Sequence, residues 1–336
     1  MTATHRRIVL ASRPGPTVTE EVFRLEDVPI PEVGAGQVLV RNHYLSLDPY
    51  MRARIDEAKS YAPTQSLGET MIGSTVGVVV ASNTPAFAVG DSVLGRFGWQ
   101  EYGVGDERSL SRIDTRVLPM SVYLGVVGMP GVTAWYGLSK ICEPKAGETV
   151  VVSAASGAVG SVVGQLAKSA GCRVIGIAGG PEKCAYVVDE LGLDACLDHR
   201  EFSDARSMAE ALGRAAPNGV DGVFENVGGA CLDAALAHIN PFGRVALCGV
   251  IAGFHGDPIP IHNVRNLLVM RVRLQGFIVS DHLEVWRQAL AELQQGVAAG
   301  RIKYRETIAQ GLESAPQAFL GMLAGRNFGK QLVKLV

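Results

Sequence analysis

The sequence predicts an α/β protein with two domains: a β-rich domain and a doubly wound parallel sheet flanked by helices. The chain has 336 residues, which suggests about two domains at roughly 150 residues each. Hydrophobic residues make up 47% and charged residues 19%, so the chain can bury a sizeable core. The 40 glycines follow no collagen-like period. They are typical of tight turns between short strands and helices.

The first 120 residues or so predict short strands separated by turns. Alternating or β-branched runs occupy residues 7–10, 38–43, 75–81 and 92–97. Proline and glycine separate them at Pro29, Pro31, Gly34, Gly36, Pro85 and Gly90. This pattern predicts an antiparallel, barrel-like β domain.

The following part of the chain alternates between strands and helices. Strand-like runs, mostly apolar on both faces, are expected at residues 149–153, 173–178, 195–198, 220–226, 244–250 and 273–279. Helices are expected from residue 159 to 167 and over 181–191, 203–215 and 231–238. Six buried strands joined mostly by helices predict a doubly wound parallel sheet.

A last helix is expected to begin beside Asp281. Asp281 and Glu284 have the spacing of a capping box. The apolar stripe expected to face the core consists of Leu283, Trp286, Leu290, Leu293 and Val297.

The turn after the first buried strand predicts a dinucleotide site. From Ala155 the sequence follows A-x-G-x-x-G, with Gly157 and Gly160 at the two glycine positions. Gly157 would let a pyrophosphate approach the backbone, and Gly160 would let the helix pack closely on the strand. The helix N-terminus would then face the phosphates. A glycine-rich turn without a cofactor is the alternative.

The second strand favours NADP over NAD. An NAD-binding sheet usually carries Asp or Glu at this point to hold the ribose 2′-hydroxyl. Here the strand ends Ala178-Gly179-Gly180 and carries no carboxylate, which leaves room for a 2′-phosphate. Lys183 follows in the next helix and can share the phosphate charge; a solvated surface lysine is the alternative.

These motifs belong to a pattern that covers essentially the whole chain. The strings are LSLDPYMR at 45–52, the turn at 154–160, GGPEK at 179–183, FENVGG at 224–229, GFIV at 276–279 and GRNFGK at 325–330. With them the sequence resembles zinc-independent medium-chain dehydrogenase/reductases. The resemblance is to the branch of prostaglandin reductases, leukotriene hydroxydehydrogenases and curcumin reductases.

The resemblance implies a GroES-like β-barrel domain formed by residues 1–124 and 302–336, with a Rossmann NADP-binding domain at 125–301 inserted between them. It implies a homodimer. It assigns the pyrophosphate to Gly157, Ala158, Val159 and Gly160 and the 2′-phosphate to Lys183. Near the adenosine it places His199, and along the ribose and nicotinamide Asn226, Cys248, Gly249, Val250, Ile251, Phe254, Phe277, Ile278, Val279 and Asn327. A turn role is the alternative for Asn327.

Two positions depart from the family pattern. His199 stands where the family often has Tyr, and it can still stack or form a hydrogen bond. Phe254 stands where a Tyr is common and lacks the hydroxyl. His255 is a candidate substitute, with a surface histidine as the alternative.

Charge and cysteine usage limit the partners. The net charge of −2 gives no reason to expect a nucleic acid. Residues 149–167 are uncharged, but their glycines and serines favour strand, turn and helix over a membrane span. The six cysteines form no C-x-x-C and have no zinc spacing with His, so buried reduced thiols in a cytoplasmic protein are expected, with no metal.

Without a metal, the expected reaction is NADPH-dependent reduction of the C=C bond of an α,β-unsaturated ketone or aldehyde, by hydride transfer to the β-carbon. Tyr50, in the D-P-Y-M-R string, is the candidate catalytic residue; a tyrosine that only packs is the alternative. Two other functions stay open: quinone reduction with NADPH, and NADPH binding without catalysis.

Overall fold

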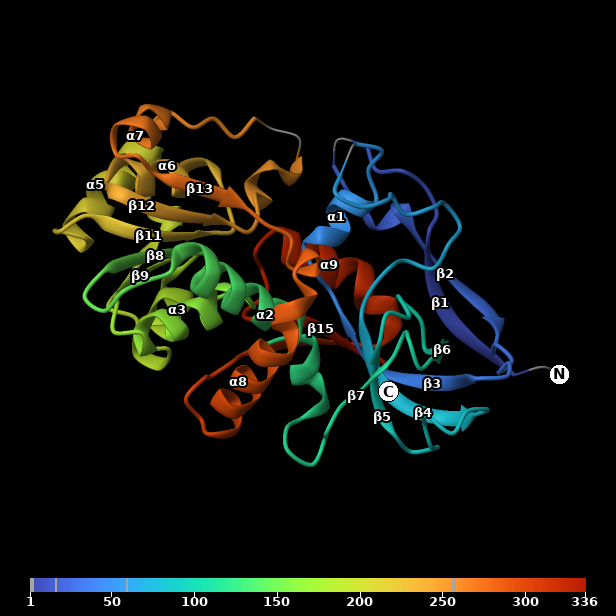
Figure 1. Cartoon of the computed structure of the whole chain (residues 1–336). Coiled ribbons are helices and arrows are strands. Elements are labelled where there is room, and N and C mark those ends of the chain that lie inside the picture. Colours follow the sequence, from blue (N-terminus) through green and yellow to red (C-terminus); the bar gives the residue numbers. More distant parts are fainter. Residues whose placement is uncertain (1–2, 16, 59, 256–257) are drawn as a thin grey trace. The chain divides into compact units, whose positions relative to one another are not determined.

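The computed structural model describes residues 3–15, 17–58, 60–255 and 258–336. The chain separates into two compact units (Figure 1). The first unit joins Met1–Gly125 to Glu306–Val336, and the second is Val126–Arg305. Each unit has its own sheet structure and its own core.

The first unit contains a two-stranded and a seven-stranded sheet. The small sheet pairs β1 (Thr4–Leu10) with β2 (Phe23–Pro29) antiparallel. The large sheet has the order β14-β15-β3-β4-β5-β7, and β6 also pairs with β3. Its strands are β3 (Gln37–Ser46), β4 (Thr75–Ser82), β5 (Ser92–Gly95), β6 (Tyr102–Asp106), β7 (Ser111–Arg112), β14 (Glu306–Gln310) and β15 (Lys330–Lys334).

Strand β3 is central because its ten residues pair with three neighbours. Val38 and Val40 point into the core while Arg41 is exposed, as expected of an alternating strand. Through β15, β3 connects the N-terminal strands to the C-terminal segment of the same unit. All its pairings are antiparallel; β14 and β15 are parallel.

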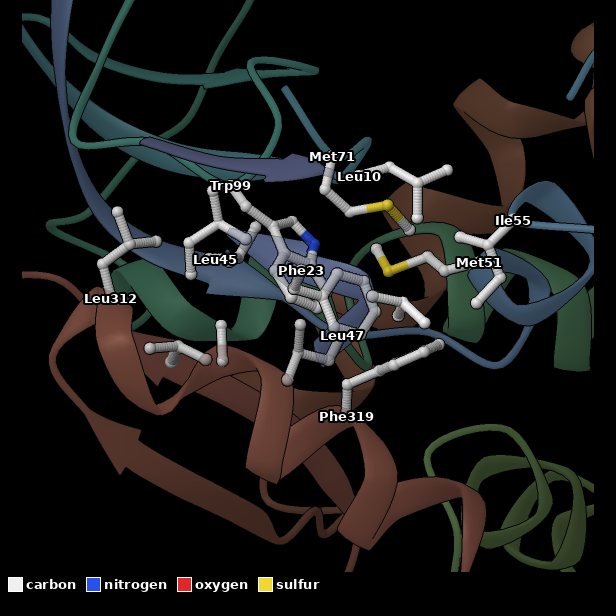
Figure 2. Close-up of a cluster of buried hydrophobic side chains, with 14 of the residues drawn as sticks. Leu10, Phe23, Leu45, Leu47, Met51, Ile55, Met71, Trp99, Leu312 and Phe319 are labelled. Carbon is white, nitrogen blue, oxygen red and sulfur yellow. The ribbon is translucent and has the colours of Figure 1, made fainter. Parts of the chain in front are cut away.

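The main core of this unit lies beside helices α1 (Tyr50–Arg54) and α9 (Ala315–Leu323). Phe23 stacks on Trp99 at a centroid distance of 5.2 Å, and Phe319 meets the Trp99 ring edge-on at 5.8 Å. Figure 2 shows Met51 and Met71 beside these aromatic rings. Met51 lies one residue after Tyr50, so burial of α1 in this core fixes where the D-P-Y-M-R segment runs.

The second unit is a six-stranded parallel sheet of order β10-β9-β8-β11-β12-β13. Its strands are β8 (Thr149–Ser153), β9 (Arg173–Ala178), β10 (Ala195–Asp198), β11 (Val220–Glu225), β12 (Ile239–Leu247) and β13 (Arg273–Gly276). Counted along the sheet this is the order 3-2-1-4-5-6 of a dinucleotide-binding fold. The expected doubly wound parallel sheet is therefore confirmed.

Helices cover both faces of this sheet. In Figure 1, α2, α3 and α8 lie on one face and α5, α6 and α7 on the other. Their bounds are α2 (Met129–Tyr136), α3 (Gly160–Ser169), α5 (Ala205–Ala215), α6 (Gly229–Ala237), α7 (Val264–Val269) and α8 (Trp286–Ala298). A short helix, α4 (Pro181–Ala185), follows β9. No helix within the described residues is long and apolar enough to span a membrane.

The capping box expected at Asp281 is wrong. Asp281 ends one 3₁₀ turn, a second turn covers Leu283–Val285, and α8 begins only at Trp286. The Trp286 indole N–H donates to the carbonyl oxygen of Val279, 3.2 Å away, which holds the two turns in place of a longer helix. Leu283 is 71% exposed and does not belong to the core stripe; Leu293 is fully buried.

The helix expected over residues 181–191 is present from Pro181 to Glu190, and it changes to π-helical hydrogen bonding at Tyr186. The expectation for the cysteines needs correction. All six cysteines are free, but Cys184, Cys196 and Cys248 are only half-buried.

Candidate functional site

The turn between β8 and α3 has the geometry of a phosphate cradle. Ala154 has a left-handed backbone, with φ of +49°, which is costly for a residue with a side chain. The chain then turns tightly, and the Gly157 N–H donates to the Ala154 carbonyl oxygen at 2.9 Å. Val159 occupies the N-cap of α3 and has no polar side-chain atom to cap it. The N–H groups of Ser161 and Val162 already donate to the carbonyl oxygens of Gly157 and Val159. The N–H groups of Ala158, Val159 and Gly160, at the start of α3, are therefore the ones offered to a ligand.

The two glycines of this turn differ in how much space they have. A Cβ atom on Gly160 would lie 2.4 Å from the carbonyl oxygen of Ala154, closer than any real contact. A Cβ atom on Gly157 would lie 3.1 Å from the same oxygen, which is tight but tolerable. Gly160 is thus required for the helix to pack on the strand. Gly157 and Ala158 are half-buried, so their backbone remains accessible.

Two cationic residues, Lys183 and Arg200, and the imidazole of His199 gather where β9 and β10 end; together they are called the cation cluster. A Cβ atom on Gly179 would lie 2.7 Å from Nε2 of His199 and 3.2 Å from Nε of Arg200. One on Gly180 would lie 3.2 Å from Nη1 of Arg200. His199 and Arg200 therefore lie directly against the glycine pair, where any larger side chain would displace them.

Lys183, His199 and Arg200 lie close enough for their charges to affect one another's pKa. Burial lowers the pKa of Lys183, and the positive charge of Arg200 lowers it further. Burial also lowers the pKa of His199; the nearby Asp198 opposes this, and Arg200 and Lys183 add to it. Cations held close together are stabilised when an anion binds among them. The cluster fits the 2′-phosphate of NADP.

Asp198 fixes the backbone of this cluster. Its Oδ1 accepts hydrogen bonds from the N–H of Gly180 at 2.8 Å and from the N–H of Arg200 at 3.0 Å. One carboxylate therefore joins the turn after β9 to the turn after β10. The sequence analysis did not identify Arg200 as a site residue. Its position two residues after the third strand of the sheet could have indicated it, because ligands bind where such strands end.

A buried carboxylate organises the ends of β8 and β11. Glu225 is 1% exposed, and its Oε1 accepts hydrogen bonds from Ser153 Oγ at 2.6 Å, Val227 N–H at 2.6 Å and Gly228 N–H at 2.8 Å. Burial raises the pKa of Glu225. Asn226 donates its side-chain amide to the Ser153 carbonyl oxygen at 2.7 Å, which fixes its orientation at the sheet edge. Sequence reasoning found Asn226 but missed Glu225 and Ser153.

The loop after β12 is attached to the same network. The N–H groups of Cys248 and Gly249 donate to the Glu225 carbonyl oxygen at 2.8 and 3.1 Å. A Cβ atom on Gly249 would lie 3.2 Å from the carbonyl oxygen of Asn226, so the two loops are in close contact. Val250, Ile251 and Phe254 continue this loop and are half-buried. The side chain of His255 lies outside the described residues.

The segment after β13 presents its residues unequally. Phe277 is buried between Tyr136, at a centroid distance of 5.4 Å, and Phe224, at 6.2 Å. Val279 is also buried, whereas Ile278 is half-exposed. The Phe277 ring is thus used in core packing, which leaves Ile278 and the backbone to line a site.

Tyr50 and Asn327 belong to the first unit. Tyr50 is half-buried at the start of α1; burial raises its pKa, and the charge of Asp48 adds to the effect. Its phenol is therefore protonated over the whole physiological range and can donate a hydrogen bond. The Asn327 side-chain amide donates to the Gly329 carbonyl oxygen at 2.8 Å, a local turn contact.

The other candidates share one edge of the second unit. Because all six strands are parallel, the residues that follow β8 to β13 meet at the carboxyl edge of the sheet. The glycine turn, the cation cluster and the Asn226 network are all brought to this edge. Dinucleotides bind at such an edge, next to the reversal of strand order between β8 and β11.

Comparison with known proteins agrees with this geometry. A family described as "N-terminal domain of oxidoreductase" matches residues 6–113, and one described as "Zinc-binding dehydrogenase" matches 158–295. Within the described part of the chain, no three His, Cys, Asp or Glu residues are grouped to hold a metal ion.

Three similar proteins cover nearly the whole chain. The NADPH-dependent curcumin reductase of Escherichia coli is 45% identical over 98% of this chain and 97% of its own. The 2-alkenal reductase (NADP(+)-dependent) of Nicotiana tabacum is 42% identical over 90% and 88%. The crystal structure of CurA from Vibrio vulnificus in complex with NADPH is 45% identical with a TM-score of 0.93, over 98% and 99%.

Proposed function

Because the chain belongs to the medium-chain dehydrogenase/reductases, in the branch of curcumin, alkenal and prostaglandin reductases, we propose that it is an NADPH-dependent enone and enal reductase. It reduces the C=C bond of α,β-unsaturated ketones and aldehydes. The observation that carries the proposal is the cluster of Lys183, His199 and Arg200 against the glycine pair at the end of β9. This cluster suits a 2′-phosphate. Two relatives of the chain are named as NADPH-dependent or NADP(+)-dependent enzymes.

The residues of the second unit fit NADPH from end to end. The N–H groups of residues 158–160 hold the pyrophosphate at the N-terminus of α3, where the helix dipole favours negative charge. Asn226 and the loop 248–254 hold the ribose and nicotinamide end. Gly249 permits the close packing of these two segments. When bound, NADPH supplies the hydride that adds to the β-carbon of the substrate.

Within the first unit, Tyr50 is the proposed hydrogen-bond donor to the substrate carbonyl. Hydride addition at the β-carbon places negative charge on the carbonyl oxygen as an enolate. A neutral phenol stabilises this charge by donating its O–H, and the raised pKa of Tyr50 keeps that proton in place. The α-carbon then takes a proton from solvent, which completes addition of H⁻ and H⁺ across the double bond.

The second unit also supports a homodimer, which we propose as the active assembly. β13 is an edge strand of the parallel sheet. The neighbouring strand β12 and the segment 261–269 that precedes β13 carry exposed apolar side chains, namely Phe242, Ile261, Val264, Leu268 and Val269. Pairing of two β13 strands around a two-fold axis would continue the sheet and cover these side chains. The six free cysteines suit a reducing compartment, and we propose the cytoplasm.

The test is a turnover assay with separate acceptor classes. The protein is mixed with NADPH and an enone, an enal or a quinone, and the loss of NADPH absorbance is followed. We expect turnover with enones and enals, and mass spectrometry should find the saturated ketone or aldehyde. Turnover with quinones alone would show that the protein is a quinone reductase and not an enone reductase. NADPH binding with no turnover on any acceptor would indicate a binding protein.

A further inference from the structure

Two cysteines of the second unit are in direct contact, in the same helix and strand that lead to the cation cluster. Cys184 in α4 and Cys196 in β10 place their sulfur atoms 2.8 Å apart. Both are half-buried free thiols. The other thiols with described contacts behave differently, since Cys142 and Cys172 each donate to a backbone carbonyl oxygen at 3.4 Å.

The pair needs little movement to become covalent. A disulfide has a sulfur–sulfur distance of about 2.05 Å, so the atoms must close by roughly 0.8 Å. The backbone of Ala178, the last residue of β9, lowers the pKa of both thiols. Both sulfur atoms therefore lie close to Ala178, the residue that directly precedes the glycine pair Gly179 and Gly180.

We propose that Cys184 and Cys196 are a redox modification site: they form a reversible intramolecular disulfide that weakens the binding of NADPH. The oxidant is a peroxide of the hydrogen peroxide class. In a reducing compartment such a bond is transient, as regulatory disulfides are.

The chemistry assigns different roles to the two sulfurs. The thiol of Cys196 donates to the sulfur of Cys184, so Cys184 is the better placed to ionise and attack. Its thiolate attacks one peroxide oxygen and the O–O bond breaks. The leaving hydroxide takes the proton that the Cys184 thiol released and becomes water, and Cys184 becomes a sulfenic acid. The Cys196 sulfur then attacks the Cys184 sulfur and the S–O bond breaks; the leaving hydroxide takes the proton of the Cys196 thiol and becomes the second water. Two thiols are oxidised by two electrons and one peroxide is reduced to two waters.

Oxidation at neutral pH should be slow. Burial raises the pKa of Cys184, and the carboxylates of Asp198 and Glu201 raise it further, while the hydrogen bond from Cys196 opposes them. The same factors keep the pair reduced under ordinary conditions and make mildly alkaline buffer the suitable condition for a test.

The effect on NADPH binding follows from which segment can move. Cys196 is held in the sheet, where it pairs with Gly176 of β9. Cys184 lies in a five-residue helix directly after Lys183. Closing the bond should draw α4 toward β10 and move Lys183 with it. This step of the inference rests on the proposed function, because it assigns the 2′-phosphate to Lys183.

The first experiment tests the bond itself. The full-length protein is treated with hydrogen peroxide at pH 8.5, alkylated and digested, and its peptides are analysed by mass spectrometry. We expect one linked peptide pair that joins Cys184 to Cys196 and disappears after dithiothreitol. Linkage of any other cysteines, or no linkage, would overturn the proposal, and neither result depends on catalysis.

The second experiment tests the consequence. Oxidised wild-type protein should show a KM for NADPH raised by about 3- to 10-fold, with kcat and the KM for NADH changed less than about two-fold. Dithiothreitol should restore the KM. Cys184→Ser and Cys196→Ser should each abolish the response to peroxide; if one variant does not fold, the other suffices.

The two failures are distinguishable. If the disulfide forms but the KM for NADPH is unchanged, the proposal that oxidation weakens NADPH binding is wrong. The proposed enone reductase activity is not affected by that result. A protein with no NADPH-dependent turnover before oxidation refutes the proposed function, and the linked peptide is still measured by mass.

Discussion

The ammonium nitrogen of Lys330 lies 2.7 Å from Oδ1 of Asp48, and the two side chains are only 5% and 6% exposed. Lys330 also donates to the Leu47 carbonyl oxygen at 2.7 Å, and the Asp48 carboxylate accepts from Ser46 Oγ at 2.5 Å. The pair joins the G-R-N-F-G-K string to the D-P-Y-M-R string across 282 positions of sequence. It fixes the segment that leads into Tyr50.

Removing the Lys330 charge should destabilise the first unit strongly. Lys330→Met leaves the buried carboxylate of Asp48 without its cation, and such a loss typically costs about 3–5 kcal/mol. The measurement is the free energy of unfolding in urea. Lys334→Met, an exposed lysine of the same strand, is the matched control and should cost less than about 0.5 kcal/mol. Equal losses would show that the ion pair contributes nothing special.

The cation cluster predicts cofactor preference. Lys183→Ala and Arg200→Ala should each raise the KM for NADPH by about 10- to 100-fold, because each removes a charged partner of the 2′-phosphate. NADH lacks this phosphate, so its KM should change little. Arg206→Ala, whose side chain is 89% exposed on α5, is the control for loss of a surface charge. Equal effects on NADPH and NADH would refute the assignment.

The parts that sequence analysis predicted well are local. The run at 149–153, the A-x-G-x-x-G spacing and the absence of a carboxylate at 177–180 are each contained within a few residues of sequence. Such signals are set by strand and turn geometry, so they survive without knowledge of the tertiary fold. The doubly wound parallel sheet could be predicted in this way, whereas the order of its six strands comes from the structure.

The parts that sequence analysis missed depend on distant partners. Glu225 bonds Ser153 across 72 positions, and Arg200 reaches the glycine pair only because β9 and β10 are neighbours. No periodicity marks such a contact. The wrong helix start at Asp281 has the same origin, because the Trp286 contact with Val279 decides the local turn. Capping spacing alone could not reveal it.

The glycine turn predicts two different losses. Gly160→Ala should lower stability by about 1–3 kcal/mol, because its Cβ would overlap the Ala154 carbonyl oxygen. Gly157→Ala has more room and should cost less stability, but its methyl group would project where the pyrophosphate is proposed. We therefore expect the larger rise in KM for NADPH in Gly157→Ala, measured beside urea unfolding. The opposite ranking in both measurements would contradict this account of the turn.

The exposed apolar side chains of β12 and of the segment 261–269 predict a homodimer. Leu268 is 80% exposed on α7. Leu268→Glu would bury a charge if that surface pairs with a second copy, so the variant should shift to a monomer. Light scattering during gel filtration measures the mass directly. Leu283→Glu changes an equally apolar residue, 71% exposed, outside this surface and should leave the dimer intact.

The proposed role of Tyr50 as a hydrogen-bond donor predicts a kinetic effect that a tyrosine with only a packing role would not cause. Tyr50→Phe keeps the ring and removes the proposed donor to the enolate oxygen, so kcat on an enone should fall about 10- to 100-fold with the KM for NADPH unchanged. Tyr123→Phe is the control, since that hydroxyl donates to the Asp114 carbonyl oxygen at 2.9 Å within the same unit.

The pH profile gives a second, independent check on Tyr50. The neutral phenol is the donor, and the raised pKa of Tyr50 extends that form to higher pH. Tyr50 should therefore cause no alkaline loss of kcat up to about pH 10, the ordinary pKa of tyrosine. If Tyr50→Phe keeps full turnover, this residue only packs, and the enolate must be stabilised by another group. An alkaline loss below pH 9 that vanishes in Tyr50→Phe would instead mean that its phenol ionises readily, against the effect of its burial.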